Sequence, residues 1–328
     1  MTSVLIVGGT GQISAACVPL ALERGLDVTV LNRGSTSLRG VPDGVEVLHG
    51  DIRDPGSVRE ALGGREFDVV TEFLAFTPAH ALTDLDLFEG RAGQYVFISS
   101  ASAYETPPTR LPVTEATPLV NPYWQYSRDK AACEALLFAA HAERGFPVTV
   151  VRPSDTYDRT RIPTTGGWAD AERMRHGANV VVVGDGTTLW TLTHSRDFAV
   201  GFVGLLGRSE AIGEAFHITS DFAPTWDRIY GILGEALGVE PLLVHVPAED
   251  LAAVDARLGE SLLGDKAHSM VFDNAKIKAL VPEFDPTTTV EEGLRESVEW
   301  FLADPARQVV DAERDSAFDR ALARLPGL

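Results

Sequence analysis

A short apolar strand that leads directly into a glycine-rich turn constrains the fold of this chain more than any other feature. Val4 to Val7 precede the sequence Gly8-Gly9-Thr10-Gly11-Gln12-Ile13-Ser14, and a helical pattern follows to about Arg24. Glycines let the backbone turn sharply and approach a neighbouring group closely. Ser14 stands where such turns usually carry a further glycine, and serine is small enough to keep the helix near the strand. Strand, turn and helix in this order predict the first unit of an α/β fold.

Strand-like and helix-like segments alternate through the first half of the chain. The strand-like runs are rich in β-branched residues and lack polar alternation, which indicates strands covered on both faces, as in a parallel sheet. They lie at residues 4–7, 28–31, 45–48, 67–70, 95–98 and 148–151, and the last follows a long helix that begins near Tyr126. We therefore predict a Rossmann-type, doubly wound parallel sheet of the α/β class in a dinucleotide-binding domain over residues 1–155.

The pattern loosens after Arg152-Pro153. Residues 154–179 carry Pro, Gly, Thr and Trp instead of periodic apolar runs, and strands are predicted at 180–183 and 215–218. The remainder is mostly helical, with a charged amphipathic tail from Pro305 to Arg324. We expect residues 156–328 to form a smaller, mixed α/β substrate-binding region, with segments near 180–220 returning to the Rossmann sheet.

Charge and cysteine content exclude several classes of protein. The 328 residues carry 28 Lys and Arg against 47 Asp and Glu, a net charge of −19 that makes nucleic acid an unlikely partner. No run approaches the roughly 20 apolar residues of a membrane span. Cys17 and Cys133 are too few for a disulfide framework or a zinc site, so we expect no metal. The start of the chain leaves no room for a signal peptide, and we predict a cytoplasmic protein.

The end of the second predicted strand is where such folds read the adenosine ribose. Here it carries Asn32 and Arg33, whereas a site selective for NAD needs a carboxylate that repels a 2′-phosphate. Asn32 cannot repel that phosphate and Arg33 could pair with it, which favours NADP over NAD. Arg33 could equally be a solvated loop residue. Asp51 and Ile52 follow the third strand and are placed to flank the adenine.

A tyrosine and a lysine one helical turn apart suggest proton transfer. Tyr126 and Lys130 open the long helix and share one face of it. A phenol has a pKa near 10, and a nearby ammonium together with a positively charged nicotinamide favours the phenolate. Ser100 lies upstream, at the carboxyl end of the fifth strand, where open α/β sheets place their ligands. Its hydroxyl could donate a hydrogen bond to the reacting oxygen.

The glycine turn, Ser100, Tyr126 with Lys130, and Arg152-Pro153, in this order, resemble the extended short-chain dehydrogenase/reductase superfamily. Within it the chain is similar to the NAD-dependent epimerase/dehydratase family. The similarity continues through residues 184–187 and 194–199, whereas the last hundred residues match only in general character. The resemblance implies a small-molecule substrate such as a sugar or polyol, and a homodimer formed through the helix that carries Tyr126.

The resemblance also implies individual roles. Tyr126 would be the general base or acid, Lys130 would bind the nicotinamide ribose and lower the pKa of the tyrosine, and Ser100 would hydrogen-bond the reacting oxygen. Further residues are implied at the pyrophosphate (Gly8, Gly11, Ile13), the adenosine ribose (Asn32, Arg33), the adenine (Asp51, Ile52) and the nicotinamide side (Leu74, Ala75), and Gln12 and Pro153 are expected at the cofactor as well.

Two departures from the family pattern concern the substrate. Dehydratases of the family usually follow the active-site serine or threonine with an Asp-Glu pair, where this chain has Ala101 and Ser102. Elimination needs an acid and a base at that place, so dehydration is disfavoured unless another carboxylate substitutes. The carboxylates that could do so are Glu72, Glu105 and Asp155.

The second departure is Trp190, which stands where nucleotide-sugar enzymes of the family commonly carry an arginine for the substrate diphosphate. An indole cannot neutralise a phosphate, although it can stack on a sugar or base. The charge could come instead from Arg159, Arg161 or Arg196, or the substrate could lack a nucleotide diphosphate. The residues expected at the substrate are Ser102, Trp168, Trp190 and Arg196, although each tryptophan could also be a core residue.

Three functions are compatible with these residues. The first is an epimerase that acts through a transient ketone, with Tyr126 as base and acid. The second is an NADPH-dependent ketoreductase or alcohol dehydrogenase that uses the same groups. The third is a non-catalytic dinucleotide- or RNA-binding protein, because Asn32-Arg33-Gly34 and the region of Trp190 are similar to those of chloroplast stem-loop RNA-binding proteins. The substrate, and the choice between epimerase and reductase, stay open at this level.

Overall fold

A parallel seven-stranded sheet forms the centre of the computed structural model, which describes residues 1–34 and 38–325. The strand order is β10-β6-β5-β4-β1-β2-β3. This is the predicted Rossmann-type sheet, and the prediction is confirmed. The strands are β1 (Ser3–Val7), β2 (Asp27–Asn32), β3 (Glu46–His49), β4 (Phe67–Glu72), β5 (Ala92–Ile98), β6 (Val148–Pro153) and β10 (Ala215–Ile218).

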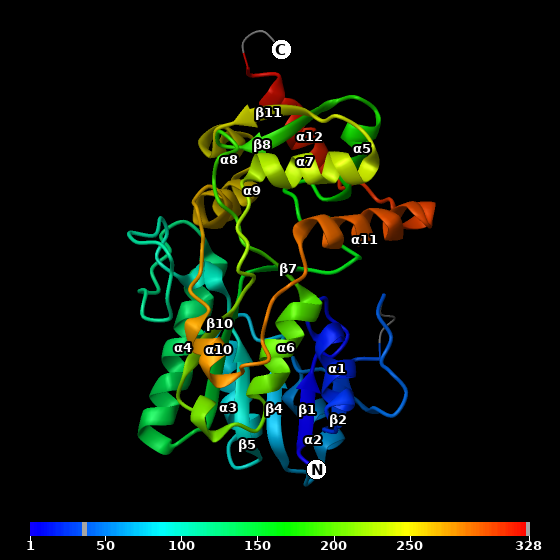
Figure 1. Cartoon of the computed structure of the whole chain (residues 1–328). Helices are drawn as coiled ribbons and strands as arrows, with labels where there is room; N and C mark the ends of the chain where they lie inside the picture. The colour runs from blue at the N-terminus through cyan, green and yellow to red at the C-terminus, as the bar shows by residue number, and fades with distance from the viewer. Residues whose placement is uncertain (35–37, 326–328) are drawn as a thin grey trace.

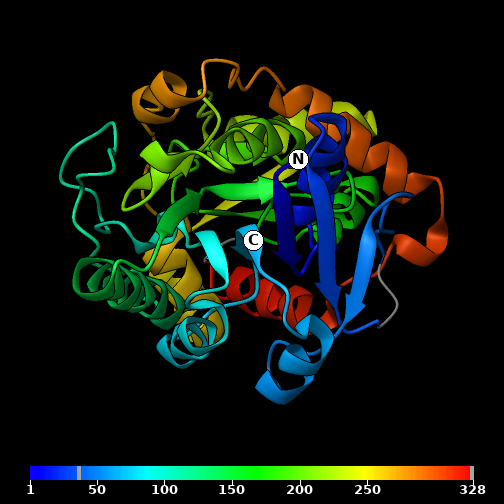
Figure 2. The same ribbon diagram turned by 90° about the horizontal axis from the view of Figure 1, so that it is seen from below.

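Alternate residues of the central strands enter two different cores, because successive side chains of a strand point to opposite faces. On β1, Val4 and Ile6 pack beneath one layer of helices, whereas Leu5 and Val7 pack beneath the other. Figure 2 shows the sheet between these layers. The first layer contains α1 (Ser14–Glu23) and α6 (Ser195–Leu205), and the second contains α2 (Pro55–Leu62), α3 (Pro78–Phe88) and α4 (Gln125–Arg144).

The strand order reverses at β1, which lies between β2 and β4. The carboxyl ends of strands at such a point border a crevice, and ligands of open α/β sheets bind there. The glycine turn follows β1, and residues 73–75 follow β4, so both segments lie at this crevice.

A smaller region caps the carboxyl ends of the sheet (Figure 1). It is built around two short parallel pairs, β8 (Asn179–Val183) with β11 (Leu242–Val246) and β7 (Asp155–Tyr157) with β9 (Leu192–His194). Its helices are α5 (Trp168–Arg175), α7 (Trp226–Leu237), α8 (Ala248–Val254), α9 (Ala256–Ser261), α11 (Val290–Leu302) and α12 (Ala312–Leu322), whereas α10 (Ala275–Leu280) packs against the central sheet beside β10 and α6. The short turns are η1 (Ala101–Ala103), η2 (Ser209–Ala211), the π-helical η3 (Leu262–Lys266) and η4 (Pro305–Arg307).

Of the segments near residues 180–220, β10 and α6 lie with the large sheet, whereas β8 and β9 do not. β10 extends the sheet beside β6, and α6 packs on its face, whereas β8 pairs with β11 and β9 with β7 in separate sheets. Residues 242–246 had not been identified as a strand, so the partner of β8 was not visible in the sequence. The charged tail forms η4 and α12, and α12 buries Phe318 in the core of the cap. No helix of the described residues is long and apolar enough to span a membrane.

Candidate active site

Two adjoining cavities lie at the carboxyl ends of the central strands. The main cavity has a volume of about 580 Å³ and the second about 360 Å³. Both are lined by Gly8, Gly11, Leu74 and Phe76, so they meet at the glycine turn. Together they extend from Asn32 and Arg33 at one end to Tyr126 at the other, which is the elongated form that a dinucleotide requires.

The glycine turn leaves no room for side chains on its inner side. Gly8 has a φ of +85°, and a Cβ atom there would lie 2.8 Å from Leu74 Cγ. Ser14 stabilises the turn, because its hydroxyl donates to the carbonyl of Gly8 and accepts from the N–H of Gly11 at 2.9 Å. The described residues offer no acceptor to the backbone N–H groups of Gln12 and Ile13. Unpaired N–H groups at the start of a helix fit the pyrophosphate of a dinucleotide.

The second cavity contains the residues predicted at the adenosine. Asn32, Arg33, Asp51 and Ile52 all line it, and Arg33 is exposed at its edge. Arg53 lines it as well, and its guanidinium donates to the carbonyl of Leu74. Sequence reasoning did not identify Arg53. The cavity therefore brings two cations near the position expected for the ribose.

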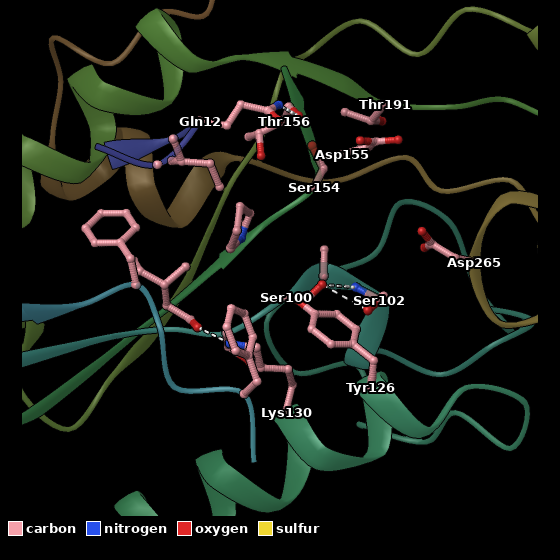
Figure 3. A pocket seen from close by; sticks show the side chains of 18 of the residues that line it. Gln12, Ser100, Ser102, Tyr126, Lys130, Ser154, Asp155, Thr156, Thr191 and Asp265 are labelled. Atoms are coloured by element: carbon pink, nitrogen blue, oxygen red, sulfur yellow. Dashed lines mark hydrogen bonds between the residues drawn. The ribbon is translucent and has the colours of Figure 1, made fainter. Parts of the chain in front are cut away.

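Ser100, Tyr126 and Lys130 line the same side of the main cavity (Figure 3). α4 supplies Tyr126 and Lys130 from its first turns, and Ser100 follows β5 and caps η1. Ser127 donates to the hydroxyl of Ser102 at 2.9 Å, and the Ser102 hydroxyl lies 2.9 Å from that of Ser100. The N–H of Ser102 also donates to Ser100 Oγ. When Ser102 donates along this chain, the proton of Ser100 is left for the hydroxyl of Tyr126 or for a ligand in the cavity.

Lys130 is buried between the ends of two strands. Its Nζ donates to the carbonyls of Ala75 and Ile98, at 2.6 and 2.7 Å. The same atom lies 4.8 Å from the ring centre of Phe76 and 4.9 Å from that of Phe97. Burial lowers the pKa of Lys130 to about 8. Ala75 thus acts at the site through its carbonyl oxygen.

Tyr126 keeps its proton in the protein by itself. Burial raises its pKa to about 12, and a hydrogen bond with Ser100 opposes that shift. Nζ of Lys130 lies 5.8 Å from the centre of the phenol ring. The sequence had suggested that the ammonium favours the phenolate, whereas in the protein alone burial has the larger effect.

Two residues predicted at the substrate lie outside the cavities. Trp168 is buried in the core of the cap, stacked on Phe301 with ring centres 4.9 Å apart. Arg196, in the first turn of α6, is half-exposed and pairs with Glu296 on another surface. These two predictions are corrected for the same reason, since each side chain finds its partners on α11, which the sequence pattern could not place beside them.

Ser102, Trp190 and Pro153 do line the main cavity. Trp190 is only 3% exposed, because it stacks on Trp226 with ring centres 5.4 Å apart. It therefore offers a ligand an edge of the ring and little of its face. Its Nε1 lies 3.4 Å from a carboxylate oxygen of Asp155, which also lines the cavity.

The carboxylates that could substitute for the missing Asp-Glu pair have different positions. Glu72 is completely buried at the end of β4, outside the cavity lining, and accepts a hydrogen bond from the N–H of Leu74. Burial raises its pKa well above the usual range. Glu105 accepts from Thr109 in a loop outside the cavity. Of the three candidates, only Asp155 lines the cavity.

Four charged residues meet at the end of the main cavity nearest the cap. They are Asp155, Arg161, Asp265 and Lys266. Asp155 and Arg161 had been considered from the sequence, whereas Asp265 and Lys266 were missed because no motif surrounds them. Arg159 is exposed outside the cavity lining.

Comparison with known proteins agrees with this arrangement. The model of the NAD dependent epimerase/dehydratase family matches residues 4–219, well over half of the chain. This chain belongs to that family. Its sheet and glycine turn lie within the matched region, as do Ser100, Tyr126 and Lys130.

Similarity to individual proteins of the family is low. The chain is 28% identical to the chloroplast stem-loop binding protein of 41 kDa b of Arabidopsis thaliana, over 74% of this chain and 65% of that protein. It is also 28% identical to a dTDP-glucose 4,6-dehydratase of an Actinoplanes species, over 64% of this chain and 61% of that protein. Both matches span less than two thirds of the relative. An epimerase structure from Methanothermobacter thermautotrophicus superposes with a TM-score of 0.77, at 19% identity and with 94% of each chain covered.

Proposed function

We propose that this protein is an NAD(P)-dependent epimerase that acts on a hydroxyl-bearing carbon of a sugar-like substrate through a transient ketone. The observation that carries the proposal is the position of Ser100, Tyr126 and Lys130 on one side of a cavity that adjoins the glycine turn. When bound, the nicotinamide supplies the acceptor and the donor of a hydride. The chain supplies the groups that orient the substrate and move its proton.

Each of the three side chains has a role that follows from its contacts. Ser100 donates a hydrogen bond to the substrate oxygen and holds that oxygen near Tyr126. The Tyr126 hydroxyl exchanges a proton with the same oxygen, as base in one direction and as acid in the other. Lys130 donates hydrogen bonds to two carbonyls, which hold its ammonium in place, and its positive charge lies near Tyr126.

Epimerisation is preferred to dehydration because the residues after Ser100 carry no carboxylate. Ala101 and Ser102 are both buried in η1, and their side chains cannot protonate a departing hydroxyl as an acid pair would. A ketoreductase or alcohol dehydrogenase is the second candidate. The observation that favours it is the exposed Arg33 beside Asn32, since NADPH is the usual reducing cofactor.

We further propose NADP as the preferred cofactor, a homodimer, and a cytoplasmic location. Arg33 and Arg53 both line the adenosine end of the site, which suits a 2′-phosphate. α4 exposes Ala132, Ala135 and Ala139 along one side, and such small residues permit close packing of helices from two chains. Cys17 and Cys133 are free and buried, as suits a reducing compartment. We propose no role in RNA binding, because the net charge is −19.

Cofactor analysis of the purified protein tests the proposal. Denaturation should release about one NADP or NAD per chain if the cofactor is recycled within each turnover. Tyr126→Phe should retain that cofactor and lose about 10²–10⁴-fold in rate, which is the usual contribution of a general acid or base. An empty protein that binds NADPH and consumes it with simple ketones would favour the reductase. Failure to bind either dinucleotide would refute both readings.

A further inference from the structure

In the cluster of charged side chains at the end of the main cavity, the carboxylate of Asp155 pairs with both cations, Arg161 and Lys266. One of its carboxylate oxygens accepts from Arg161, and the other lies 2.9 Å from Lys266 Nζ. These two cations lower the pKa of the buried Asp155 carboxyl below its usual range. Breaking a buried ion pair is costly, because it leaves a charge without its partner. Arg161 and Lys266 therefore already have a counter-ion in the protein, the carboxylate of Asp155.

Lys130 is the third cation of the cavity lining, and it also has partners. Its ammonium donates to the carbonyls of Ala75 and Ile98 beneath the cavity floor. Every lysine and arginine that lines the main cavity within the described residues thus already contacts protein oxygen atoms. A substrate phosphate would have to displace one of these contacts or remain unpaired.

Asp265 differs from the rest of the cluster. Among the described residues, the only polar partner of its carboxylate is Lys266 Nζ at 3.7 Å, which is beyond hydrogen-bond distance. Figure 3 shows its side chain directed into the cavity, between Ser102 and Asp155. Burial, with a contribution from the charge of Asp155, raises the pKa of Asp265 to about 7. Above about pH 7, where Asp265 is ionised, its acceptor oxygens face the cavity and its charge opposes a phosphate there.

The turn that carries Asp265 is firmly held. Asn121 donates to the carbonyl of Gly264 at 2.6 Å, and the indole of Trp226 donates to the carbonyl of Lys266 at 3.0 Å. Asn121 also donates to the carbonyl of Ser102, so one side chain connects η3 to the catalytic loop. The position of Asp265 relative to Ser100 and Tyr126 is set by these contacts and needs no ligand.

The remaining surface of this end combines apolar side chains with hydroxyl groups. Trp124, Met270 and Phe272 provide the apolar part, and Ser102 and Thr191 provide the hydroxyls. Faces of a sugar or cyclitol ring pack on apolar side chains, while their hydroxyls need acceptors such as a carboxylate. A compact ring that carries hydroxyl groups and no charge matches this surface.

We infer that the end of the cavity formed by Asp265, Asp155 and Lys266 binds an uncharged polyhydroxylated ring, with the Asp265 carboxylate as hydrogen-bond acceptor, and disfavours a substrate that carries phosphate. This inference names the substrate class of the proposed function and rests on it. It departs from the sugar nucleotides named in several solved structures of similar fold.

Calorimetric titration in the presence of excess NADP⁺, at a pH about one unit above the pKa of Asp265 so that its carboxylate is ionised, tests the inference. The probes are D-glucose and myo-inositol as neutral rings, with UDP-glucose and UDP as their phosphate-bearing counterparts. At least one neutral ring should bind at least tenfold more tightly than UDP-glucose. Asp265→Asn should weaken that binding about tenfold and strengthen the binding of UDP-glucose, since an amide does not repel phosphate. The control is Asp250→Asn, which changes an exposed residue of α8 and should alter neither affinity.

The outcomes separate this inference from the proposed function. Tighter binding of UDP-glucose or UDP than of both neutral rings overturns the inference, as does an Asp265→Asn variant with unchanged affinities. Failure of both neutral rings to bind while NADP⁺ binds overturns it as well. If a neutral ring binds in the expected, Asp265-dependent way but neither dinucleotide binds, the ring subsite stands and the proposed function fails.

Discussion

Tyr126 and Lys130 owe their protonation states to burial more than to their neighbours' charges. Tyr126 and Lys130 are four residues apart on one helix, yet burial dominates the pKa of each, raising that of the phenol to about 12 and lowering that of the ammonium to about 8. Both shifts favour the uncharged form, as desolvation requires. In the protein by itself the site therefore holds a protonated tyrosine and a lysine whose charge is lost just above neutral pH.

The pKa of Lys130 predicts the basic limb of the pH profile. The charged form is present below about pH 8 and disappears as the pH rises through that value, so the ratio of kcat/KM for the wild type to that for Lys130→Arg should be level below pH 8 and fall about tenfold per unit above it, because the contribution of Tyr126 cancels in the ratio. Lys130→Arg keeps its charge throughout this range, so its profile should lack the limb even if the rate is lower. Measurement of kcat/KM from pH 6 to 10 checks this. If the decrease above pH 8 persists unchanged in Lys130→Arg, it is caused by the titration of another group.

Arg33 predicts the preference between the two dinucleotides. A charge-assisted hydrogen bond to a phosphate is worth roughly 1.5–3 kcal/mol, so Arg33→Ala should weaken NADP⁺ binding about 10- to 100-fold. Binding of NAD⁺ should change by less than about threefold, because NAD⁺ lacks the 2′-phosphate. Fluorescence titration of both cofactors measures this, with the exposed Arg110→Ala as the control. Equal losses for both dinucleotides would contradict the assignment.

At the scale of the elements, one buried ion pair joins the sheet to α4, the helix that carries Tyr126 and Lys130. Arg152, on β6, contacts Glu134 of α4 through two nitrogen atoms, at 3.0 and 2.6 Å, and also donates to the hydroxyl of Tyr104. Ser99, beside the proposed catalytic residue Ser100, donates to the same carboxylate. The Arg152-Pro153 motif thus acts structurally through its arginine, by aligning α4 with the ends of β5 and β6.

Removal of one member of this pair should destabilise the fold. Glu134→Ala leaves the Arg152 guanidinium buried without its counter-ion, and such a change costs about 3–5 kcal/mol of unfolding free energy. The double variant Glu134→Leu with Arg152→Met removes both charges and should recover most of that loss. Urea unfolding followed by circular dichroism measures the difference. If Glu134→Ala is as stable as the wild type, the ion pair does not stabilise the packing of α4 against the sheet.

At the scale of the whole molecule, the candidate active site belongs to neither part alone. The sheet and its flanking helices contribute the glycine turn, Ser100, Tyr126 and Lys130, and the smaller region contributes Asp155, Asp265 and Lys266 as a cap (Figure 1). The acidic surface of the molecule opposes association with polyanions. The exposed alanines of α4 lie on the helix that carries Tyr126 and Lys130, so the proposed assembly through this face would also hold the candidate site in place.

A substitution on this face tests the proposed homodimer. Ala135 is exposed on α4, and Ala135→Glu would place a charge, and its symmetry mate, in a closely packed helix interface. Light scattering after gel filtration at micromolar concentration should show a dimer for the wild type and a monomer for the variant. Ala253→Glu, on the exposed side of α8, should remain dimeric. A wild-type protein that is monomeric at these concentrations would refute the proposal.

The sequence by itself determined the sheet, the glycine turn and the pairing of Tyr126 with Lys130. Each depends on a local regularity: β-branched runs indicate strands covered on both faces, and a spacing of four brings two side chains onto one face of a helix. Only the tertiary structure decided which distant groups meet. Asp155 and Lys266 are 111 residues apart in the sequence and meet in the cavity. Trp168 and Arg196 lie outside the site because each contacts a residue of α11. Local periodicity carries no information on such contacts, because they are set by how the elements pack against one another.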